Sequence, residues 1–237
     1  MPNHFYIAPD IADLNPGNTI TLSSDQLHYL KRVLRLRSGD GVNCFDGEGL
    51  RFHAHLGADQ KLTVASCAAR EPPPVIRIHL ALALLKGAAM DHAIQLGCES
   101  GADDISLFAA HRSNVQFDAR RLGNKVVHWQ RVIVSACEQS GRSYLPIFNA
   151  EGTPSTILQN SPDAITYALH MDGGPFNSLT GADRLLFIGP EGGWSDEELR
   201  FFEEEKVQRV SVGPTTLRAE STPGAAMAIL NYLDSTL

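Results

Sequence analysis

A glycine-rich segment near the C-terminal end of the chain has the residue types of a ligand site. Ile188-Gly-Pro-Glu-Gly-Gly-Trp-Ser195 follows an apolar run and precedes a helix start at Ser195-Asp-Glu-Glu198. Glycine lets the backbone approach a flat or charged ligand closely, and the start of a helix attracts negative charge. The spacing fits neither the Gly-x-Gly-x-x-Gly of dinucleotide sites nor a phosphate loop, which needs Gly-Lys-Ser/Thr. Taken alone, such a turn is structural as often as it binds a ligand.

A second long loop follows the next apolar run. Val210-Ser-Val-Gly-Pro-Thr-Thr-Leu-Arg-Ala-Glu-Ser-Thr-Pro-Gly224 combines glycines, hydroxyl side chains and the charged residues Arg218 and Glu220. We expect the two loops at the carboxyl ends of neighbouring strands, facing each other across a crevice, where open α/β sheets bind ligands. The two loops together are a more specific sign of a ligand site than either alone.

The elements that would hold these loops begin after Glu71-Pro-Pro-Pro74. Consecutive prolines cannot continue a helix or a central strand, so a domain boundary is expected there, between residues 1–71 and 75–237. After the prolines, strand patterns alternate with helix patterns, which predicts an α/β layer with a mostly parallel sheet. The expected strands are Ile76–Leu84, Asp104–Ala109, Ile165–His170, Arg184–Ile188 and Arg209–Val212. The expected helices are Met90–Ser100, Leu122–Ser140, Asp196–Lys206 and Pro223–Asp234.

The segment before the prolines has a different pattern. Short runs rich in branched and aromatic residues predict strands, and one amphipathic helix is expected over Ser24–Leu34. This pattern favours a small β-barrel with a single helix. The expected strands are His4–Ile7, Thr19–Leu22, Val42–Asp46, Leu50–Leu56 and Leu62–Cys67.

Composition excludes several classes of protein. With 43% hydrophobic residues among 237, the chain can bury a core and is not a disordered or fibrous protein. The longest apolar run, Leu80–Leu85, is far shorter than the roughly 18 residues that span a bilayer, and no export signal begins the sequence. We therefore expect a cytoplasmic protein with no membrane partner. Four dispersed cysteines and the pair His53-x-His55 do not make a metal site, so no metal is expected.

The charge of the chain is unevenly distributed. A net charge of −7 argues against a broad nucleic-acid surface, because Lys and Arg supply most non-specific affinity for phosphates. Lys31-Arg-Val-Leu-Arg-Leu-Arg37 nevertheless places four cations in seven residues. This cluster is either a solvated helix face or a local RNA contact.

The two C-terminal motifs, Ile188-Gly-Pro-Glu-Gly-Gly-Trp-Ser195 and Thr216-Leu-Arg-Ala-Glu220, resemble those of the ribosomal RNA small subunit methyltransferase E family of the SPOUT superfamily. The resemblance extends over most of the chain in the same order. Among the similar segments are His28-Tyr-Leu-Lys-Arg-Val-Leu-Arg35, Asp46-Gly-Glu-Gly49, Arg112-Ser113 and Ala136-Cys-Glu-Gln-Ser-Gly-Arg142.

The resemblance implies an α/β protein with an N-terminal PUA-like β-barrel and a SPOUT domain whose C-terminal part forms a trefoil knot. The implied activity is transfer of a methyl group from S-adenosylmethionine to N3 of a specific uridine in small-subunit (16S) ribosomal RNA, without a metal. The implied partners are this RNA or the assembled small subunit, and a second copy of the chain in a homodimer.

The same resemblance implies roles for individual residues. Arg112 and Arg218 would be catalytic through their charge, and Glu220 would be an assisting base. Glu138 and Arg142 would position the RNA. The cluster Lys31, Arg32, Arg35 and Arg37 is also expected to bind RNA, because of its positive charge. The donor would be bound by Leu169, His170, Met171, Ile188, Gly189, Pro190, Glu191, Gly192, Gly193, Val212, Gly213, Thr216, Leu217 and Arg218.

Two alternatives remain open at this stage. One is a knotted methyltransferase that acts on another RNA, and the other is an RNA-docking protein without catalysis.

The chain departs from the family pattern at two positions. These are His4, where an Arg is usual nearby, and His111, where a Glu is usual.

Overall fold

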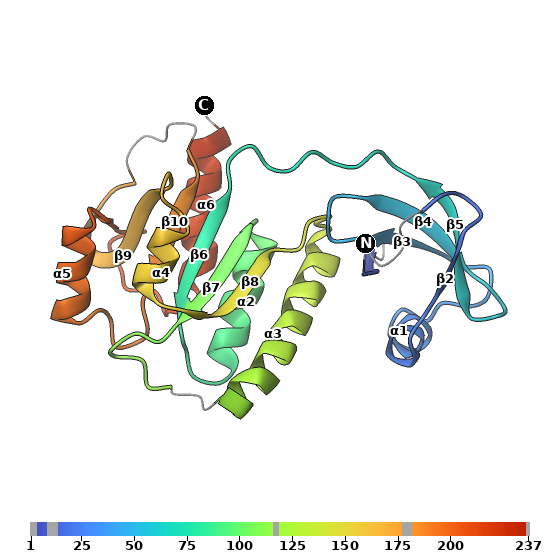
Figure 1. The fold of residues 1–237 in the computed structure, drawn as a ribbon, viewed down its shortest axis with the longest axis horizontal. Helices are drawn as coiled ribbons and strands as arrows, with labels where there is room; N and C mark the ends of the chain where they lie inside the picture. Colours follow the sequence, from blue (N-terminus) through green and yellow to red (C-terminus); the bar gives the residue numbers. More distant parts are fainter. Residues whose placement is uncertain (1–3, 9–13, 116–118, 177–181, 236–237) are drawn as a thin grey trace. The chain divides into compact units, whose positions relative to one another are not determined.

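The computed structural model describes residues 4–8, 14–115, 119–176 and 182–235. The chain divides into two compact units (Figure 1). The first contains Met1–Pro73 together with Cys137–Leu145, and the second contains Pro74–Ala136 together with Pro146–Leu237. The second unit is thus interrupted by a nine-residue segment that belongs to the first unit and includes Glu138 and Arg142.

The first unit is built on a five-stranded sheet with the strand order β1-β3-β4-β5-β2. The strands β1 and β3 are parallel, and the other described neighbours are antiparallel. Alternate residues of the strands, such as Val42, Phe52, Ala54 and Leu62, are buried in one apolar core. The strands are β1 (His4–Tyr6), β2 (Thr19–Thr21), β3 (Gly41–Phe45), β4 (Arg51–Leu56) and β5 (Lys61–Cys67).

Two features of this unit differ from the sequence expectation. Within the described residues, β1 and β2 are the edges of the sheet, so the unit is a half-barrel instead of a closed barrel. The expected helix over Ser24–Leu34 has two parts, α1 (Ser24–His28) and a π-helical turn, η1 (Tyr29–Val33). The Ser23 side chain caps α1 through a capping box with Gln26. Leu30, which is fully buried, anchors the π-helical turn to the core.

The segment Cys137–Leu145 packs within the first unit through polar contacts. The carboxylate of Glu138 accepts a hydrogen bond from the Tyr6 backbone N–H at 3.1 Å and another from the Tyr29 hydroxyl. Burial raises the pKa of Glu138, and these two bonds partly oppose that shift. Arg51 donates to the carbonyl of Gly141 at 2.7 Å and forms an ion pair with Glu71 at 2.6 Å.

The second unit contains a six-stranded, entirely parallel sheet with the order β11-β9-β10-β6-β7-β8. Its strands are β6 (Ile78–Ala83), β7 (Asp104–Phe108), β8 (Ile147–Gly152), β9 (Ile165–Gly174), β10 (Arg184–Ile188) and β11 (Gln208–Val210). Its helices are α2 (Ala88–Glu99), α3 (Ala119–Ser140, whose last turn lies in the first unit), α4 (Pro154–Gln159), α5 (Asp196–Glu204) and α6 (Thr222–Ser235).

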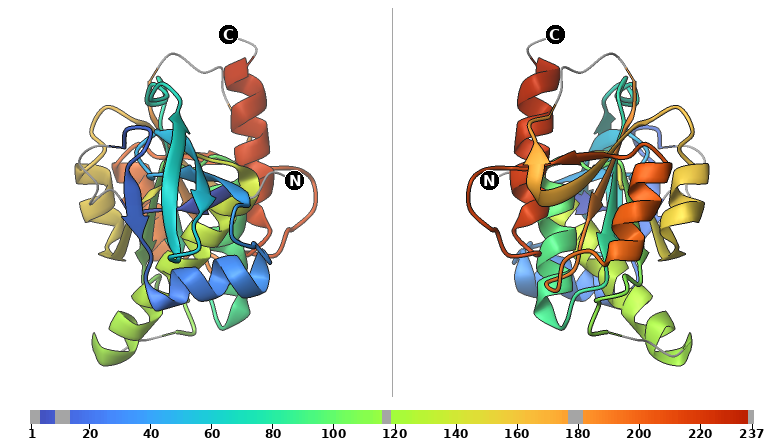
Figure 2. Two further views of the ribbon diagram at one scale, coloured as in Figure 1. Left: turned by 90° about the vertical axis from the view of Figure 1, so that its right-hand side faces the viewer. Right: turned by 90° about the vertical axis from the view of Figure 1, so that its left-hand side faces the viewer.

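Helices cover both faces of this sheet, which explains why its central strands are apolar at successive positions. Alternate side chains such as Leu185 and Phe187 pack with Ile157 of α4 and Phe202 of α5. On the other face, Gly97 of α2 lies directly over Leu80, and α2 packs against α6. Figure 2 shows α4 and α5 on one side of the sheet and α2 and α6 on the other.

Most expected strands and helices of this unit are present with shifted ends. The strand Arg184–Ile188 has the expected bounds, whereas the strand from Ile165 continues past His170 to Gly174. Sequence patterns missed β8 and α4, because β8 is exposed at alternate residues on the edge of the sheet and α4 has only six residues. The two glycine-rich loops were expected on neighbouring strands, which is wrong. They follow β10 and β11, and β9 lies between these strands.

A histidine within this sheet predicts how stability depends on pH. His79 contacts the hydroxyl of Ser106 at 2.9 Å and that of Ser161 at 3.2 Å. Burial, with a smaller contribution from Arg77, lowers the pKa of His79 from 6.5 to about 4. Between these pH values, the unfolded chain takes up a proton on His79 and the folded chain does not. The stability that neutral His79 contributes to the folded state is therefore fully present above pH 6.5 and is lost as pH falls toward 4.

The expected size of the His79 effect is about 3 kcal/mol of unfolding free energy, at about 1.4 kcal/mol per pKa unit. Urea unfolding from about pH 7.5 down to about pH 4 measures it. The variant His79→Gln should show a shallower decline of unfolding free energy over this range. An equal decline in both proteins would mean that His79 titrates normally in the folded state.

Candidate functional site

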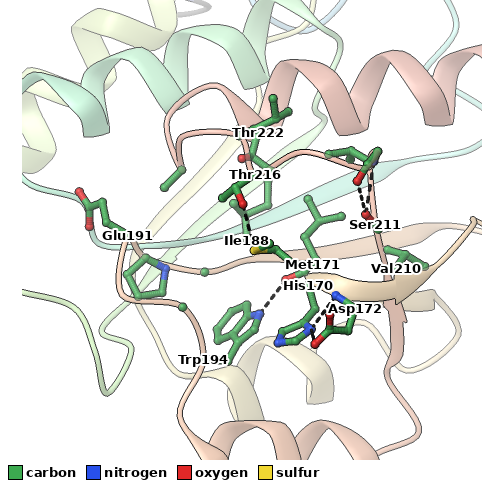
Figure 3. A pocket seen from close by; sticks show the side chains of 18 of the residues that line it. His170, Met171, Asp172, Ile188, Glu191, Trp194, Val210, Ser211, Thr216 and Thr222 are labelled. Carbon is green, nitrogen blue, oxygen red and sulfur yellow. Dashed lines mark hydrogen bonds and ion pairs between the residues drawn. The ribbon is translucent and has the colours of Figure 1, made fainter.

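A cavity of about 510 Å³ lies at the carboxyl ends of β9, β10 and β11. Three separate segments of the chain form it, namely the end of β9, the loop after β10 and the loop after β11 (Figure 3). The residues that line it are Leu169, His170, Met171, Asp172, Ile188, Gly189, Pro190, Glu191, Gly192, Gly193, Trp194, Val210, Ser211, Val212, Gly213, Thr215, Thr216, Leu217, Ala219 and Thr222.

The loop after β10, Ile188–Gly193, is a tight turn that feeds into α5. The Gly193 N–H donates to the Pro190 carbonyl at 2.9 Å, and Gly193 has a φ of +67°, which favours glycine. A Cβ at Gly189 would lie 3.0 Å from the Trp194 ring. At the end of the loop, the Ser195 side chain accepts the Glu198 N–H and caps α5. All residues of this loop line the cavity, and Glu191, Gly192 and Gly193 are exposed.

Trp194 fixes this loop to the neighbouring strand. Its indole N–H donates to the Leu169 carbonyl of β9 at 2.8 Å, and its ring stacks on Phe108 with centroids 6.1 Å apart. The side chain is buried, with 4% of its surface exposed. This contact joins two walls of the cavity, the end of β9 and the loop after β10.

The end of β9 also contacts β11 and the loop that follows it. The Thr216 hydroxyl lies 3.0 Å from the Met171 sulfur, which joins the end of β9 to the loop after β11. Gly173 lies so close to β11 that a Cβ there would stand 2.3 Å from the Val210 carbonyl carbon. Glycine is therefore required at position 173 for β11 to pair at this point.

The lining combines apolar side chains with polar groups. Met171 and Leu217 are large apolar residues with 65% and 39% of their surface exposed. Asp172, Glu191 and Ser211 add carboxylate and hydroxyl oxygens, and the glycines leave backbone groups accessible. A cavity of this size, with apolar walls and a few polar groups, suits a small molecule that has a flat ring and polar substituents.

The residues predicted to be catalytic lie beside the cavity and do not line it. Arg112 follows β7, and its guanidinium reaches the Gly192 carbonyl at 3.5 Å. Arg218 belongs to the loop after β11, and its side chain is 86% exposed and lies 3.8 Å from the Glu220 carboxylate. Arg218 was also predicted to bind the donor, but only its neighbours Leu217 and Ala219 line the cavity. The carboxylate of Glu220 is mostly buried.

Comparison with known proteins identifies the family. A family model described as an RNA methyltransferase domain matches residues 71–231, and one described as an RNA methyltransferase PUA domain matches residues 22–64. The Synechocystis protein named ribosomal RNA small subunit methyltransferase E is 34% identical over 229 residues, which are 91% of this chain and 73% of that protein. The chain belongs to the ribosomal RNA small subunit methyltransferase E family. The Bacillus subtilis member is 27% identical over 96% of this chain and 95% of its own length.

Solved structures support this placement. The methyltransferase E of Neisseria gonorrhoeae bound to S-adenosyl methionine has a TM-score of 0.86 and 26% identity, covering 98% of each chain. A Legionella pneumophila protein in complex with the bound cofactor SAM has a TM-score of 0.89 and 26% identity, again over 98% of each chain. Over 98% of its length, the chain therefore has the fold of proteins whose solved structures contain this cofactor.

The structure gathers most of the residues predicted to bind the donor. Every predicted residue from Leu169 to Leu217 lines the cavity, and Arg218 is the exception. Sequence reasoning did not select Asp172, Trp194, Val210, Ser211, Thr215, Ala219 and Thr222, which also line it. For most of these the signal was present, because they lie within or directly beside the two motifs and the Leu169–Met171 segment that the family resemblance singled out.

The residues predicted to bind RNA all belong to the first unit. Lys31, Arg32, Arg35 and Arg37 are exposed on and after η1, and Arg35 has a φ of +58°, so the chain turns there. Glu138 and Arg142 lie in the segment Cys137–Leu145 and are only partly exposed. Because the Glu138 carboxylate is engaged by Tyr6 and Tyr29, its contacts support a structural role.

Neither a metal cluster nor a membrane-spanning helix occurs in the part of the chain that the structure describes. Within residues 4–8, 14–115, 119–176 and 182–235, no group of three or more His, Cys, Asp or Glu side chains is arranged to hold a metal ion. In the same ranges, no helix has the length and apolar character needed to cross a bilayer.

Proposed function

We propose that this chain transfers a methyl group from S-adenosylmethionine to N3 of one specific uridine in small-subunit (16S) ribosomal RNA. The observation that carries the proposal is the cavity at the ends of β9, β10 and β11, in a chain that belongs to the methyltransferase E family. The cavity is formed by the segments that the sequence motifs single out, and proteins of the same fold were crystallised with this donor.

The cavity fits the donor in size and chemistry. Its volume of about 510 Å³ lies in the range typical of small-molecule sites. Met171 and Leu217 would cover the flat adenine ring, and the exposed backbone of Gly189–Gly193 would hydrogen-bond to it. Asp172 and Glu191 offer carboxylates to the positively charged donor. When bound, S-adenosylmethionine supplies a methyl group on a sulfonium, which is already an activated leaving group.

The protein must also lower the free-energy cost of forming the N3 anion of the uridine base. A uridine N3–H is weakly acidic, roughly two pKa units above neutral, so its anion near pH 7 costs about 3 kcal/mol at about 1.4 kcal/mol per unit. Arg112 and Arg218 would donate to the uracil carbonyl oxygens as negative charge develops there. Arg112 contacts the Gly192 carbonyl, so its guanidinium lies at the rim of the cavity.

Glu220 is proposed as the group that assists removal of the N3 proton. Its carboxylate lies 3.8 Å from the Arg218 guanidinium, in the loop that lines the cavity. The Arg218 carbonyl accepts hydrogen bonds from the Ser221 and Thr222 N–H groups and from the Thr222 hydroxyl. These contacts fix the backbone on either side of Glu220. The proposal involves no metal.

The family relationship also supports a wider architecture. We propose that residues 75–237 form a SPOUT domain with a C-terminal trefoil knot, that residues 1–71 form an RNA-binding PUA-like domain, and that the chain acts as a cytoplasmic homodimer. The strand order supports the knot, since the chain crosses from β10 over β9 to β11 and then returns to α6, which packs against α2.

The basic segment Lys31–Arg37 is proposed to hold RNA phosphates. Replacing Lys31 and Arg35 by Gln should weaken RNA binding and reduce the slope of log affinity against log salt by about 1 for each cation that no longer meets a phosphate. Filter binding at several salt concentrations measures this slope. Lys206→Gln, an exposed cation of the second unit, is the control. A slope unchanged in the double variant would assign Lys31–Arg37 to a solvated surface.

A two-stage assay tests the proposed function against its alternatives. Calorimetry with S-adenosylmethionine tests whether the donor binds, and labelled donor then reports transfer to small subunits that lack the modification. Binding and transfer to the small-subunit RNA are expected. Binding with transfer only to another RNA would favour the second methyltransferase hypothesis, and RNA binding without donor binding would favour the docking protein.

A further inference from the structure

The residue proposed to act on uracil, Arg112, sits in a closed turn after β7. The Ala110 N–H donates to the Ser113 hydroxyl at 3.3 Å, and the Ser113 N–H donates back to the Ala110 carbonyl at 3.0 Å. The turn therefore has its own hydrogen bonds at both ends. The strand β6 lies between β7 and β10, so other contacts must hold this turn against the loop after β10, Ile188–Gly193, here called the donor loop.

A single buried carboxylate connects this turn to the donor loop. Glu198 of α5 is 7% exposed. One of its oxygens accepts the His111 backbone N–H at 3.0 Å, and the other accepts the Ser195 backbone N–H at 2.8 Å. Hydrogen bonds to an ionised acceptor are roughly twice as strong as neutral ones. The capping box needs only the bond to Ser195, so the bond to His111 is an addition that the cap does not require.

Further contacts complete the connection. The Ser195 hydroxyl lies 3.1 Å from the His111 ring nitrogen Nδ1 and also accepts the Glu198 N–H at 3.1 Å. On the opposite side of the turn, a Cβ at Gly192 would lie 3.0 Å from the Arg112 Cβ and 3.1 Å from the Arg112 carbonyl oxygen. The Arg112 backbone thus rests directly on the donor loop, and Glu198 holds the preceding residue at the end of that loop.

We propose that Glu198 is a positioning residue that holds the Arg112 turn against the donor loop, so that the guanidinium meets the methyl acceptor. This inference rests on the proposed function, in which Arg112 stabilises charge on the acceptor base. A carboxylate is needed because both N–H groups require an acceptor. The side-chain amide of Gln has only one acceptor oxygen, which cannot serve the two positions that the two carboxylate oxygens occupy.

The first test is Glu198→Gln, with Glu204→Gln as the matched control. Glu204 is an exposed carboxylate on the same helix. Glu198→Gln should lower kcat about 10- to 100-fold, because a displacement of about 1 Å of a catalytic group has an effect of this order. The dissociation constant for S-adenosylmethionine should change less than about threefold, and Glu204→Gln should match the wild type. An unchanged kcat in a folded Glu198→Gln protein would overturn the proposal.

A double-mutant cycle separates positioning from general structural support. If Glu198 acts through Arg112, Glu198→Gln should have little further effect on kcat in an Arg112→Ala background. Additive losses would overturn the proposal. Should Glu198→Gln not fold, Glu198→Asp retains the charge and shortens the side chain, and it is expected to give the same loss of kcat.

Hydrogen exchange tests the connection without any activity. The His111 amide should exchange at least about tenfold faster in Glu198→Gln than in the wild type, because its acceptor is weakened. Unchanged exchange would overturn the inference whatever the turnover. If exchange accelerates but the wild-type protein transfers no methyl group, the proposed function has failed while the connection itself stands.

Discussion

Arg112→Ala and Arg218→Ala should each lower kcat for methyl transfer by a factor of about 10² to 10³ while leaving the affinity for S-adenosylmethionine within a few-fold of the wild type. Loss of one donor that stabilises developing negative charge has an effect of this order, about 3 to 4 kcal/mol. Donor affinity should persist because neither arginine lines the cavity. Single-turnover rates and calorimetry give the two quantities.

Arg200→Ala is the matched control for both arginines. Arg200 is exposed on α5 and contacts only the Asp196 carbonyl, at 3.3 Å, among the interactions described for it. It should keep wild-type turnover. If Arg112→Ala or Arg218→Ala also kept wild-type turnover, that residue would be removed from the mechanism and its charge assigned to the protein surface. A large loss of donor affinity instead of kcat would assign the arginine to donor binding.

Gly173→Ala is the second change with a large expected effect. A Cβ at this position would meet the carbonyl carbon and oxygen of Val210 at 2.3 and 2.5 Å, and these are backbone atoms that cannot rotate away. β11 must therefore separate from β9, which is expected to cost about 3 kcal/mol, at the upper end for overpacking. Because β11 leads into the Val212–Leu217 wall of the cavity, donor affinity should fall at least about tenfold.

Gly174→Ala provides a neighbouring control. A Cβ at Gly174 would meet nothing within 4 Å, and its φ is not in the left-handed region. Thermal unfolding should show a drop of about 6 to 12 °C for Gly173→Ala, at about 2 to 4 °C per kcal/mol in a chain of this size, and little change for Gly174→Ala. Equal stability of the two variants would show that β11 adjusts around the new methyl group.

Local patterns predicted the parts of the fold that local physics determines. The strand Arg184–Ile188 contains the continuous apolar run Leu185–Ile188 and is covered on both faces, and the structure has it with the expected bounds. The capping box at Ser195 and Glu198 was readable from residue types and spacing alone. The helix expected from Pro223 begins at Thr222, and proline favours the first turn of a helix. The helix expected from Met90 begins at Ala88, where no side chain caps it.

The remaining features depend on residues that are distant in sequence. No local pattern indicates that β9 separates β10 from β11, so the two motif loops were wrongly expected on neighbouring strands. The requirement for Gly173 comes from Val210, far later in the chain, and the bond from His111 to Glu198 spans 87 positions. The first unit was expected to be a closed β-barrel. Strand propensity predicts the strands but does not determine whether the edge strands β1 and β2 pair with each other.

The family resemblance added the site residues that propensities cannot supply. It selected Leu169, His170 and Met171 as donor residues, although their sequence alone indicates an ordinary strand end. The structure brings them together with the loops after β10 and β11. Arg218 is not in the lining, although its neighbours Leu217 and Ala219 are. Its side chain is 86% exposed, and its guanidinium lies 3.8 Å from the Glu220 carboxylate.

Locating the transferred methyl group tests the proposed activity of this protein most directly. Small subunits that lack the modification would be incubated with the protein and labelled S-adenosylmethionine, and the RNA would be digested and mapped by mass spectrometry. Label is expected on N3 of a single uridine of the small-subunit RNA. Label on another base position, on ribose or on a different RNA would contradict the proposed activity.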